Sequence, residues 1–386
     1  MAMTFSPIPL TGVPFAKSEY ERRQQKVLEA VVSAELDALL VTAHANLQYL
    51  TGYNGRGAYF APFPLILMPG RAPTYVVREY EMAAVRADSC IDQIVPYAQQ
   101  GDFAKVCADV LKRYGLQRRR VGLELGCWNL APADVSALQA QLTDLQIVDA
   151  TRVVSLVKAV KSGAELDAMR GAMAMTDLAV QTFQHSLREG VTEAEVAALI
   201  EREVTKAGGQ ISTVSSLGFG ERTRLPHGVP APHPIRINEP AMVEIGCSKH
   251  GYATGLVRSA VIGRHPETES LHALAEDALE AAIAAIKPGV AAGAVDAAAR
   301  KMIERCGRPQ AFRHRTGYAT GPQWSGRGNL SLEPGATDVL QAGMTLHLPI
   351  LLFGQSDYII GCSEHVVVTE RGAEILSRTP HTLYRA

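Results

Sequence analysis

The chain has 386 residues, of which 47% are hydrophobic and 20% charged, and this composition is typical of a globular protein with a large core. Its formal net charge of −1 gives no electrostatic argument for binding nucleic acid or an anionic membrane surface. At this length we expect two domains.

The six cysteines lie far apart in the sequence and form no C-x-x-C pair. In a chain of this length, that spacing favours reduced core thiols. The N-terminus lacks the charged-then-apolar pattern of a signal peptide, and no apolar run is long enough to cross a bilayer. We therefore expect a cytoplasmic protein that binds neither membranes nor nucleic acid.

The first 150 residues alternate between predicted helices and strands. Periodicity and mixed charge predict an amphipathic surface helix over residues 17–33. Short apolar runs bounded by Gly and Pro are typical of strands. The runs that follow predict strands at 38–43, 61–68, 73–77, 120–125 and 145–150, and helices near 80–87 and 103–114. This alternation indicates an α/β domain.

Residues 46–57 lie between the first two predicted strands and are rich in glycine and aromatic residues. We expect an exposed loop there, either an ordinary surface turn or a loop that reaches a ligand. In the second case, Tyr53 and Arg56 are candidate substrate-binding residues.

After Ala150 the pattern changes to long helices. Ser162 with Glu165, and Thr192 with Glu195, fit capping boxes, which predicts helices through about residues 187 and 206. The expected domains are therefore 1–155 and 156–386.

The second domain contains an internal repeat. Residues 189–209 and 288–308 superpose at an offset of 99 residues, with Gly190 matching Gly289 and Gly208 matching Gly307. Two similar α+β halves would place a site where their sheets meet.

Residues 241–263 read as two apolar strands joined by a short polar turn at 248–251. Val243 and Ile245 flank Glu244, so the first strand is expected to carry this carboxylate into the interior. Burying an unpaired carboxylate is costly, and a second acid, Glu364, lies in another apolar strand. The two acids are either an active-site pair or structural partners of groups such as Arg258.

Several other residues are candidates for chemistry. His227 follows a proline in a loop and is a surface residue unless it has catalytic neighbours. His347 interrupts an apolar strand, where a hydrogen-bonded core histidine is the more common case. Tyr318 lies in a Gly-bracketed turn, and Trp324 follows in a polar loop.

Taken together, these segments resemble the creatinase/aminopeptidase P family across nearly the whole chain. The resemblance implies an α/β N-terminal domain and an α+β catalytic domain with a pseudo-two-fold "pita-bread" fold. It rests on Tyr49-Leu50-Thr51-Gly52, Val157-Lys158, Lys161-Ser162, Met169-Arg170, Pro226-His227, Lys287-Pro288-Gly289, Gly343-Met344 and the stretch from Glu364 to Gly372.

The metallopeptidases of this family hold two metal ions through two Asp, one His and two Glu. The matching positions here are Glu244, Gly255, Tyr318, a position near Pro349, and Glu364. Glycine and proline side chains offer no ligand, so the resemblance implies no dinuclear metal site and no other cofactor. A single ion held by His347, Glu244 and Glu364 is a minor alternative.

The family's metal-free branch includes creatinase and the ectoine hydrolases, and GMTLHLP (343–349) and Glu244-Ile245-Gly246 look most like the latter. The resemblance implies a metal-independent C–N hydrolase of a small cyclic amidine or guanidino acid. Glu244 would attack the amidinium carbon or direct water to it, and His227 would move protons. Glu364 would hold the cationic N–H edge.

The resemblance also implies binding residues and an assembly. Tyr318, Trp324 and His347 would line the pocket, with the indole stacked on the cation. Arg258, or Arg56 from the N-terminal loop, would hold a substrate carboxylate. A homodimer is expected, in which Arg56, Tyr59 or Phe60 reaches the neighbouring subunit's site.

Two other functions stay open. One is a peptidase of the Xaa-Pro dipeptidase or aminopeptidase type, whose chemistry in this fold depends on a metal-bound hydroxide. The other is a binding protein that kept the fold without catalysis.

Overall fold

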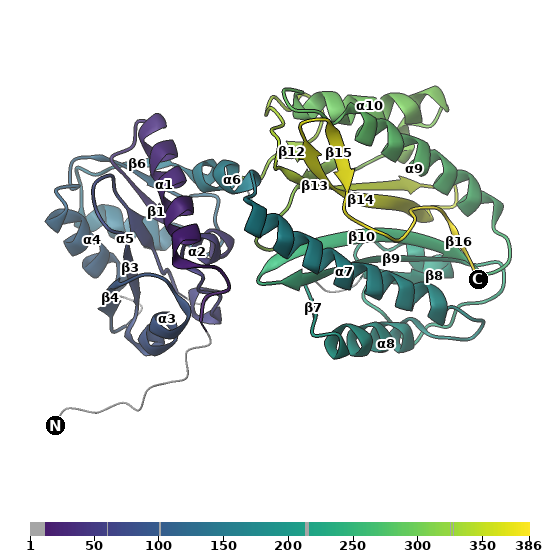
Figure 1. Ribbon diagram of the computed structural model, residues 1–386, viewed down its shortest axis with the longest axis horizontal. Coiled ribbons are helices and arrows are strands. Elements are labelled where there is room, and N and C mark those ends of the chain that lie inside the picture. Colours follow the sequence, from purple (N-terminus) through teal and green to yellow (C-terminus); the bar gives the residue numbers. More distant parts are fainter. Residues whose placement is uncertain (1–11, 60, 100–101, 213–215, 325, 327) are drawn as a thin grey trace. The chain divides into compact units, whose positions relative to one another are not determined.

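The computed structural model describes residues 12–386 except 60, 100–101, 213–215, 325 and 327 (Figure 1). The chain divides into an N-terminal unit, Met1–Lys158 with Gly326–Gly328, and a C-terminal unit, Ala159–Ser325 with Asn329–Ala386. Within the described ranges, no helix combines the length and the apolar character needed to span a membrane. All six cysteines are free thiols.

The N-terminal unit is a six-stranded mixed sheet with the strand order β4-β3-β2-β1-β5-β6. In the central strand β1, Leu39 and Val41 belong to one hydrophobic core and Ala38 and Leu40 to a second core, because successive side chains point to opposite faces. Both faces are therefore covered, which confirms the α/β prediction. The strands are β1 (Ala38–Val41), β2 (Leu65–Leu67), β3 (Thr74–Arg78), β4 (Gln93–Tyr97), β5 (Arg120–Leu123) and β6 (Gln146–Asp149), and the helices are α1 (Lys17–Ser33), α2 (His44–Thr51), α3 (Met82–Asp88), α4 (Phe103–Arg113), α5 (Pro132–Gln141) and α6 (Thr151–Ala159).

The expectation of an exposed loop at 46–57 is wrong for most of that segment. Residues 44–51 form α2, all of whose residues are buried, and Gly52 ends the helix in the left-handed conformation at φ 85°. The Tyr49 and Tyr53 side chains are each 1% exposed. Phe60 lies outside the described residues, as do the side chains of Arg56 and Tyr59.

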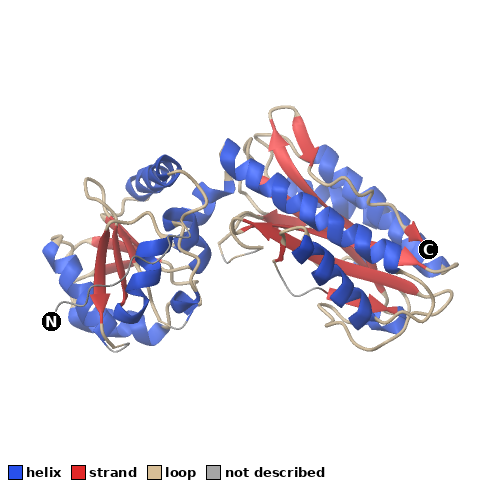
Figure 2. Ribbon diagram, turned by 60° about the horizontal axis from the view of Figure 1, so that its bottom comes forward, coloured by secondary structure: helices blue, strands red, loops and turns tan. Residues whose placement is uncertain are grey.

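The C-terminal unit contains two five-stranded sheets, each with two long helices on its outer side (Figures 1 and 2). The first sheet has the order β16-β10-β9-β7, with β8 also paired to β9, and the second has the order β12-β11-β13-β14-β15. The first half comprises α7 (Gly163–Ser186), α8 (Glu193–Lys206), β7 (Gln210–Ile211), β8 (Ser216–Phe219), β9 (Pro240–Lys249) and β10 (Tyr252–Val261), and the second comprises α9 (Pro266–Ala285), α10 (Ala292–Arg305), β11 (Gly317–Ala319), β12 (Ser331–Leu332), β13 (Thr345–Phe353), β14 (Ile359–Thr369) and β15 (Gly372–Ile375), with β16 (Tyr384–Arg385) returning to the first sheet.

The internal repeat is confirmed by the structure. Helices α8 and α10 have 14 residues each, and they begin at Glu193 and Ala292, which preserves the offset seen in the sequence. Gly190 and Gly289 precede them at φ 86° and 85°. Their backbone N–H groups donate to equivalent carbonyls, those of Ile235 and Leu340. The two halves are thus built on one plan.

The two sheets meet along β10 and β14, which are joined by side-chain hydrogen bonds. Val257 N donates to Ser363 Oγ over 2.6 Å, and Ser259 Oγ donates to the Gly361 carbonyl over 2.7 Å. The two large apolar cores of this unit lie on the helix-facing sides of the sheets. The opposite sides of the sheets are therefore free to line a pocket.

Candidate active site

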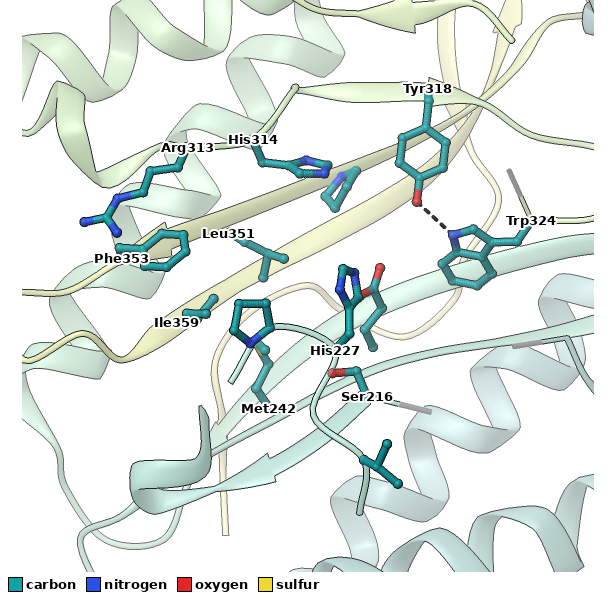
Figure 3. A pocket seen from close by; sticks show the side chains of 14 residues that line it. Ser216, His227, Met242, Arg313, His314, Tyr318, Trp324, Leu351, Phe353 and Ile359 are labelled. Atoms are coloured by element: carbon teal, nitrogen blue, oxygen red, sulfur yellow. Dashed lines mark hydrogen bonds between the residues drawn. The ribbon is translucent and has the colours of Figure 1, made fainter. Parts of the chain in front are cut away.

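A cavity of about 590 Å³ is lined by residues of both halves of the C-terminal unit (Figure 3). The repeat predicted a site at this place. Four candidates from the sequence, His227, Glu244, Tyr318 and Trp324, lie together in its wall. The complete lining is Ser216, Pro226, His227, Val229, Met242, Glu244, Arg313, His314, Tyr318, Trp324, Pro349, Leu351, Phe353 and Ile359.

Glu244 lies in the middle of β9, between Ser216 on β8 and Val257 on β10. The predicted hairpin is confirmed: β9 and β10 pair antiparallel, and His250 and Gly251 make the turn at φ 54° and 80°. Burial raises the pKa of the Glu244 carboxyl, and the nearby His227 partly offsets this effect. Glu244 is therefore a more basic carboxylate than one in water.

His227 follows Pro226 in the loop between β8 and β9, and its side chain enters the pocket beside Ser216 (Figure 3). Its backbone is in the left-handed region at φ 54°. This conformation costs a residue other than glycine roughly 1–2 kcal/mol. Such strain is concentrated at ligand and active sites, and here it accompanies an imidazole that faces Glu244.

Trp324 and Tyr318 form one end of the pocket. Trp324 Nε1 donates to the Tyr318 hydroxyl over 2.8 Å, as the dashed line in Figure 3 marks. The indole lies on Gly246 and Gly255, where a Cβ on either glycine would overlap its six-membered ring. These two glycines pair across β9 and β10, and because they have no side chains they leave room for the tryptophan.

His347 does not line the pocket, in contrast to the expectation that it contacts substrate. Its side chain is fully buried behind Tyr318, with Nδ1 3.1 Å from the Tyr318 hydroxyl and Nε2 2.9 Å from Ser363 Oγ. Burial, followed by the neighbouring His365, holds its pKa well below the ordinary value of 6.5. His347 is therefore a neutral imidazole that supports the wall.

Glu364 and Arg258 also lie outside the pocket lining, although both were expected to hold substrate. Arg258 Nη2 is 2.9 Å from Glu364 Oε1, and the two side chains are 0% and 1% exposed. The carboxylate also accepts from Ser377 Oγ over 2.5 Å and contacts His381 Nδ1 at 3.0 Å. This is the structural pairing that the sequence left open as the alternative.

Strand alternation explains the position of Glu364. In β13 and β14, His347 pairs with His365 and Pro349 with Ser363, so these residues share the face toward β10. Glu364 pairs with Leu348 on the opposite face. A shift of one residue exchanges the faces of a strand, and Ser363 rather than Glu364 occupies the pocket-side position.

The two other candidates lie in the N-terminal unit. The Tyr53 hydroxyl donates to Glu81 Oε2 over 3.3 Å within that unit. The side chain of Arg56 is outside the described part of the structure.

Nothing in the sequence selects Ser216, Arg313, His314 or Ser363 as candidates. Their types are common, and only the folded sheets bring them to the site. Arg313 and His314 belong to a short basic run, Arg313-His314-Arg315, and such runs usually lie on solvated faces. Both residues line the pocket, and Arg313 lies at the end opposite Trp324 (Figure 3).

The residues around the pocket do not fit a dinuclear metal centre. At the pocket-side positions the chain has Glu244, Gly255, Tyr318, Pro349 and Ser363, which include only one strong ligand for a hard or borderline ion. Within the described ranges, no group of three or more His, Cys, Asp or Glu side chains is arranged to bind a metal ion. The space beside Gly255 is filled by Trp324.

An α/β unit followed by two repeated α+β halves with a pocket between their sheets defines the pita-bread class of fold. The chain belongs to metallopeptidase family M24, whose model matches residues 167–370, more than half of the chain. The model of the creatinase/prolidase N-terminal domain matches residues 23–160. These matches confirm the family and the fold class predicted from the sequence.

Several relatives match the chain over nearly its whole length. The uncharacterized hydrolase/peptidase y4tL of Sinorhizobium fredii is 30% identical over 96% of this chain and 97% of its own. The putative dipeptidase YkvY of Bacillus subtilis is 27% identical over 94% and 99%. Among solved structures, the dipeptidase PepE of Mycobacterium ulcerans superposes with a TM-score of 0.86, at 27% identity over 96% and 99%. These matches support the prediction of a hydrolase, the class that the expected C–N hydrolase shares with its peptidase alternative.

Proposed function

We propose that this protein is a hydrolase that cleaves a C–N bond of a small substrate in the pocket between its two sheets, with Glu244 as the acting carboxylate. The observation that carries the proposal is the placement of Glu244 and His227 in one cavity wall, with the Glu244 pKa raised by burial. A base is most effective when its pKa lies near the working pH.

Glu244 and His227 have different roles in the proposed reaction. Glu244 accepts the proton of a water molecule that attacks the carbon of the C–N bond, and His227 donates a proton to the departing nitrogen. The substrate's oxygen or nitrogen substituents meet the Tyr318 and Trp324 end of the pocket. No step requires a bound metal ion, and the donor set described above supports metal-independent chemistry.

Two substrate classes have specific support. The names of the relatives favour an amide, as in a dipeptide. The replacement of metal ligands by Gly255, Tyr318 and Pro349 favours a cyclic amidine or guanidino acid, because a cationic carbon is attacked without a Lewis acid. Both classes carry a C–N bond and a carboxylate.

Arg313, rather than Arg258, is the arginine positioned for a substrate carboxylate. Arg313 lines the pocket, and its guanidinium lies 4.2 Å from the centre of the Phe353 ring. Its Nε donates to the Gln310 carbonyl over 3.2 Å, which orients the guanidinium edge. Charge-assisted hydrogen bonds from arginine suit a carboxylate.

A substrate panel tests the proposal. Chelator-treated protein is incubated with ectoine, creatine and a Gly-Pro dipeptide, and products are followed by mass spectrometry. We expect turnover of one class by the wild type and turnover that is lower by about 10²–10⁴-fold in Glu244→Gln. Turnover by Glu244→Gln at the wild-type rate would contradict the role of Glu244. Binding without turnover of any compound would instead support the non-catalytic alternative.

We also propose a homodimer, as the resemblance implies. Sedimentation velocity at several protein concentrations tests it, and a monomer at all concentrations would contradict it.

A further inference from the structure

The hydrogen bonds behind the pocket wall form a chain whose direction can be worked out from its buried end. Ser363 is fully buried, and its Oγ accepts the backbone N–H of Val257 over 2.6 Å. The only other partner of this hydroxyl among the described residues is His347 Nε2, at 2.9 Å. Because a buried hydroxyl proton needs an acceptor, Ser363 donates to His347 Nε2.

The direction of this hydrogen bond determines which nitrogen of His347 carries the proton. A neutral imidazole carries one N–H, and His347 is kept neutral by burial. With Nε2 as the acceptor, the proton lies on Nδ1, which donates to the Tyr318 oxygen over 3.1 Å. The tautomer of His347 is thus fixed by Ser363.

Tyr318 receives a second donor from the other side. Trp324 Nε1–H can only donate, and it reaches the same oxygen over 2.8 Å. Both lone pairs of the phenol oxygen are then used. The Tyr318 hydroxyl proton has no acceptor among the described residues, although the side chain lines the pocket and is 5% exposed.

We infer that Tyr318 is a hydrogen-bond donor to the substrate, held in that role by Trp324, His347 and Ser363, and that it selects substrates with an oxygen acceptor beside the C–N bond that is cleaved. This inference rests on the proposed function for its catalytic meaning. Glu244 lies in the same pocket wall. Its carboxylate is a hydrogen-bond acceptor. The pair therefore fits a substrate that offers an N–H donor next to a carbonyl, carboxylate or developing oxyanion.

The assignment narrows the substrate class. An amide presents its carbonyl oxygen to Tyr318, and hydrolysis turns that oxygen into an oxyanion that this donor stabilises. A cyclic amidine or guanidino acid satisfies Tyr318 only through a carboxylate or through the oxygen delivered by the attacking water. A purely cationic amidine without an oxygen acceptor is a poor ligand.

The tautomer of His347 can be measured without substrate. Full-length protein labelled with ¹⁵N-histidine is studied by long-range ¹H–¹⁵N correlation NMR, and the His347 signals are assigned from their loss in His347→Gln. We expect a protonated Nδ1 and an unprotonated Nε2. A His347 signal with the proton on Nε2 would overturn the inference, because Tyr318 would then donate to the imidazole instead of to the pocket.

Kinetics then test the role of the donor. Tyr318→Phe keeps the ring and removes only the hydroxyl, and we expect kcat to fall about 10²-fold or more, the typical effect of losing one oxyanion donor, with a smaller change in KM. Tyr80→Phe, at a side chain 84% exposed in the N-terminal unit, is the matched control and is expected to keep wild-type rates. Unchanged kcat and KM in Tyr318→Phe would overturn the inference. If wild-type protein hydrolyses nothing in the panel, the proposed function fails while the NMR experiment still decides the direction of the hydrogen bonds.

Discussion

Trp324 lies so close to Gly255 that a Cβ at residue 255 would overlap the indole ring. By the resemblance noted from the sequence, residue 255 matches a position where the family's metallopeptidases carry a metal-binding aspartate. Here the position is a glycine covered by the indole, and it offers no side chain to bind an ion. The pocket gains a flat apolar surface, and Glu244 is left as the acid on β9 that faces it.

The contact between Trp324 and Gly255 predicts the effect of one added methyl group. Gly255→Ala is expected to cost about 1–3 kcal/mol of unfolding free energy, because the extra carbon overpacks the site. Urea denaturation measures this cost. Gly163→Ala is the control, since a Cβ there meets no atom within 4 Å and the residue lies in the first turn of α7.

A second substitution makes this prediction specific. Trp324→Ala in the Gly255→Ala background removes the overlap, so the two costs should not add. Fully additive costs would show that the tryptophan does not occupy this position.

Glu244→Gln is expected to reduce kcat by about 10²–10⁴-fold, the usual contribution of a general base. Steady-state rates at saturating substrate provide the measurement. Glu280→Gln, at a side chain 70% exposed, is the matched control. Equal losses in both variants would point to a general effect of charge rather than to the acting carboxylate.

The raised pKa of Glu244 has opposite consequences for activity and stability. As a base, Glu244 must be ionised, so the rate is expected to fall as pH decreases through a pKa above the ordinary value of 4.5. A carboxyl whose pKa is higher in the folded state binds more protons there than in the unfolded chain, so its contribution to stability is lost as pH rises through that pKa.

It follows that Glu244→Gln, although much less active, should melt at a higher temperature than the wild type at neutral pH. The difference should shrink as pH decreases below the ordinary carboxyl range. Thermal melts across pH measure it, and a lower melting temperature of Glu244→Gln at neutral pH would contradict the proposed burial cost.

Glu364→Gln should affect stability more than catalysis. The substitution leaves the Arg258 guanidinium buried with a neutral partner in place of its carboxylate, and breaking a buried pair in this way typically costs about 3–5 kcal/mol. We expect lower unfolding free energy with near wild-type kcat per folded molecule. A stable but inactive Glu364→Gln protein would restore the catalytic role that the sequence suggested.

Arg313→Gln should raise KM for substrates with a carboxylate and leave kcat nearly unchanged. The comparison is between each acid and its carboxamide analogue, whose KM should not respond. Arg118→Gln, at a side chain 80% exposed in the N-terminal unit, is the control. An equal effect on acid and carboxamide would contradict the assignment of Arg313 to the carboxylate.

The sequence predicts the fold well where local signals are strong. Capping boxes at Ser162 and Thr192 located two helices correctly, because such caps are set by residues a few positions apart. Strand β4 and helix α5 were not predicted. Strand β4 contains Pro96, which is unfavourable in most strands, and α5 buries only Leu138 and offers little periodicity. Helix α2 was misread because it is buried on all sides and has no exposed face to reveal a period.

The site was harder to predict than the fold. Glu244 could be selected because an acid between apolar neighbours is unusual, and His227 because the family resemblance implies a role in proton transfer. Glu364 met the same criterion but faces the helix side of its sheet. The positions of Ser363 and Arg313 depend on strand register and on sheet pairing across more than 100 residues, which residue types alone do not encode.

The proposed function requires that this pocket hydrolyses a C–N bond without a dinuclear metal centre. The most direct measurement is the hydrolysis rate of the best substrate by protein whose metal content has been reduced by chelation and quantified by mass spectrometry, before and after adding manganese or cobalt. We expect full activity with less than stoichiometric metal and no increase on addition. Activity that appears only with added metal, in proportion to the metal bound, would rule out metal-independent hydrolysis in this pocket.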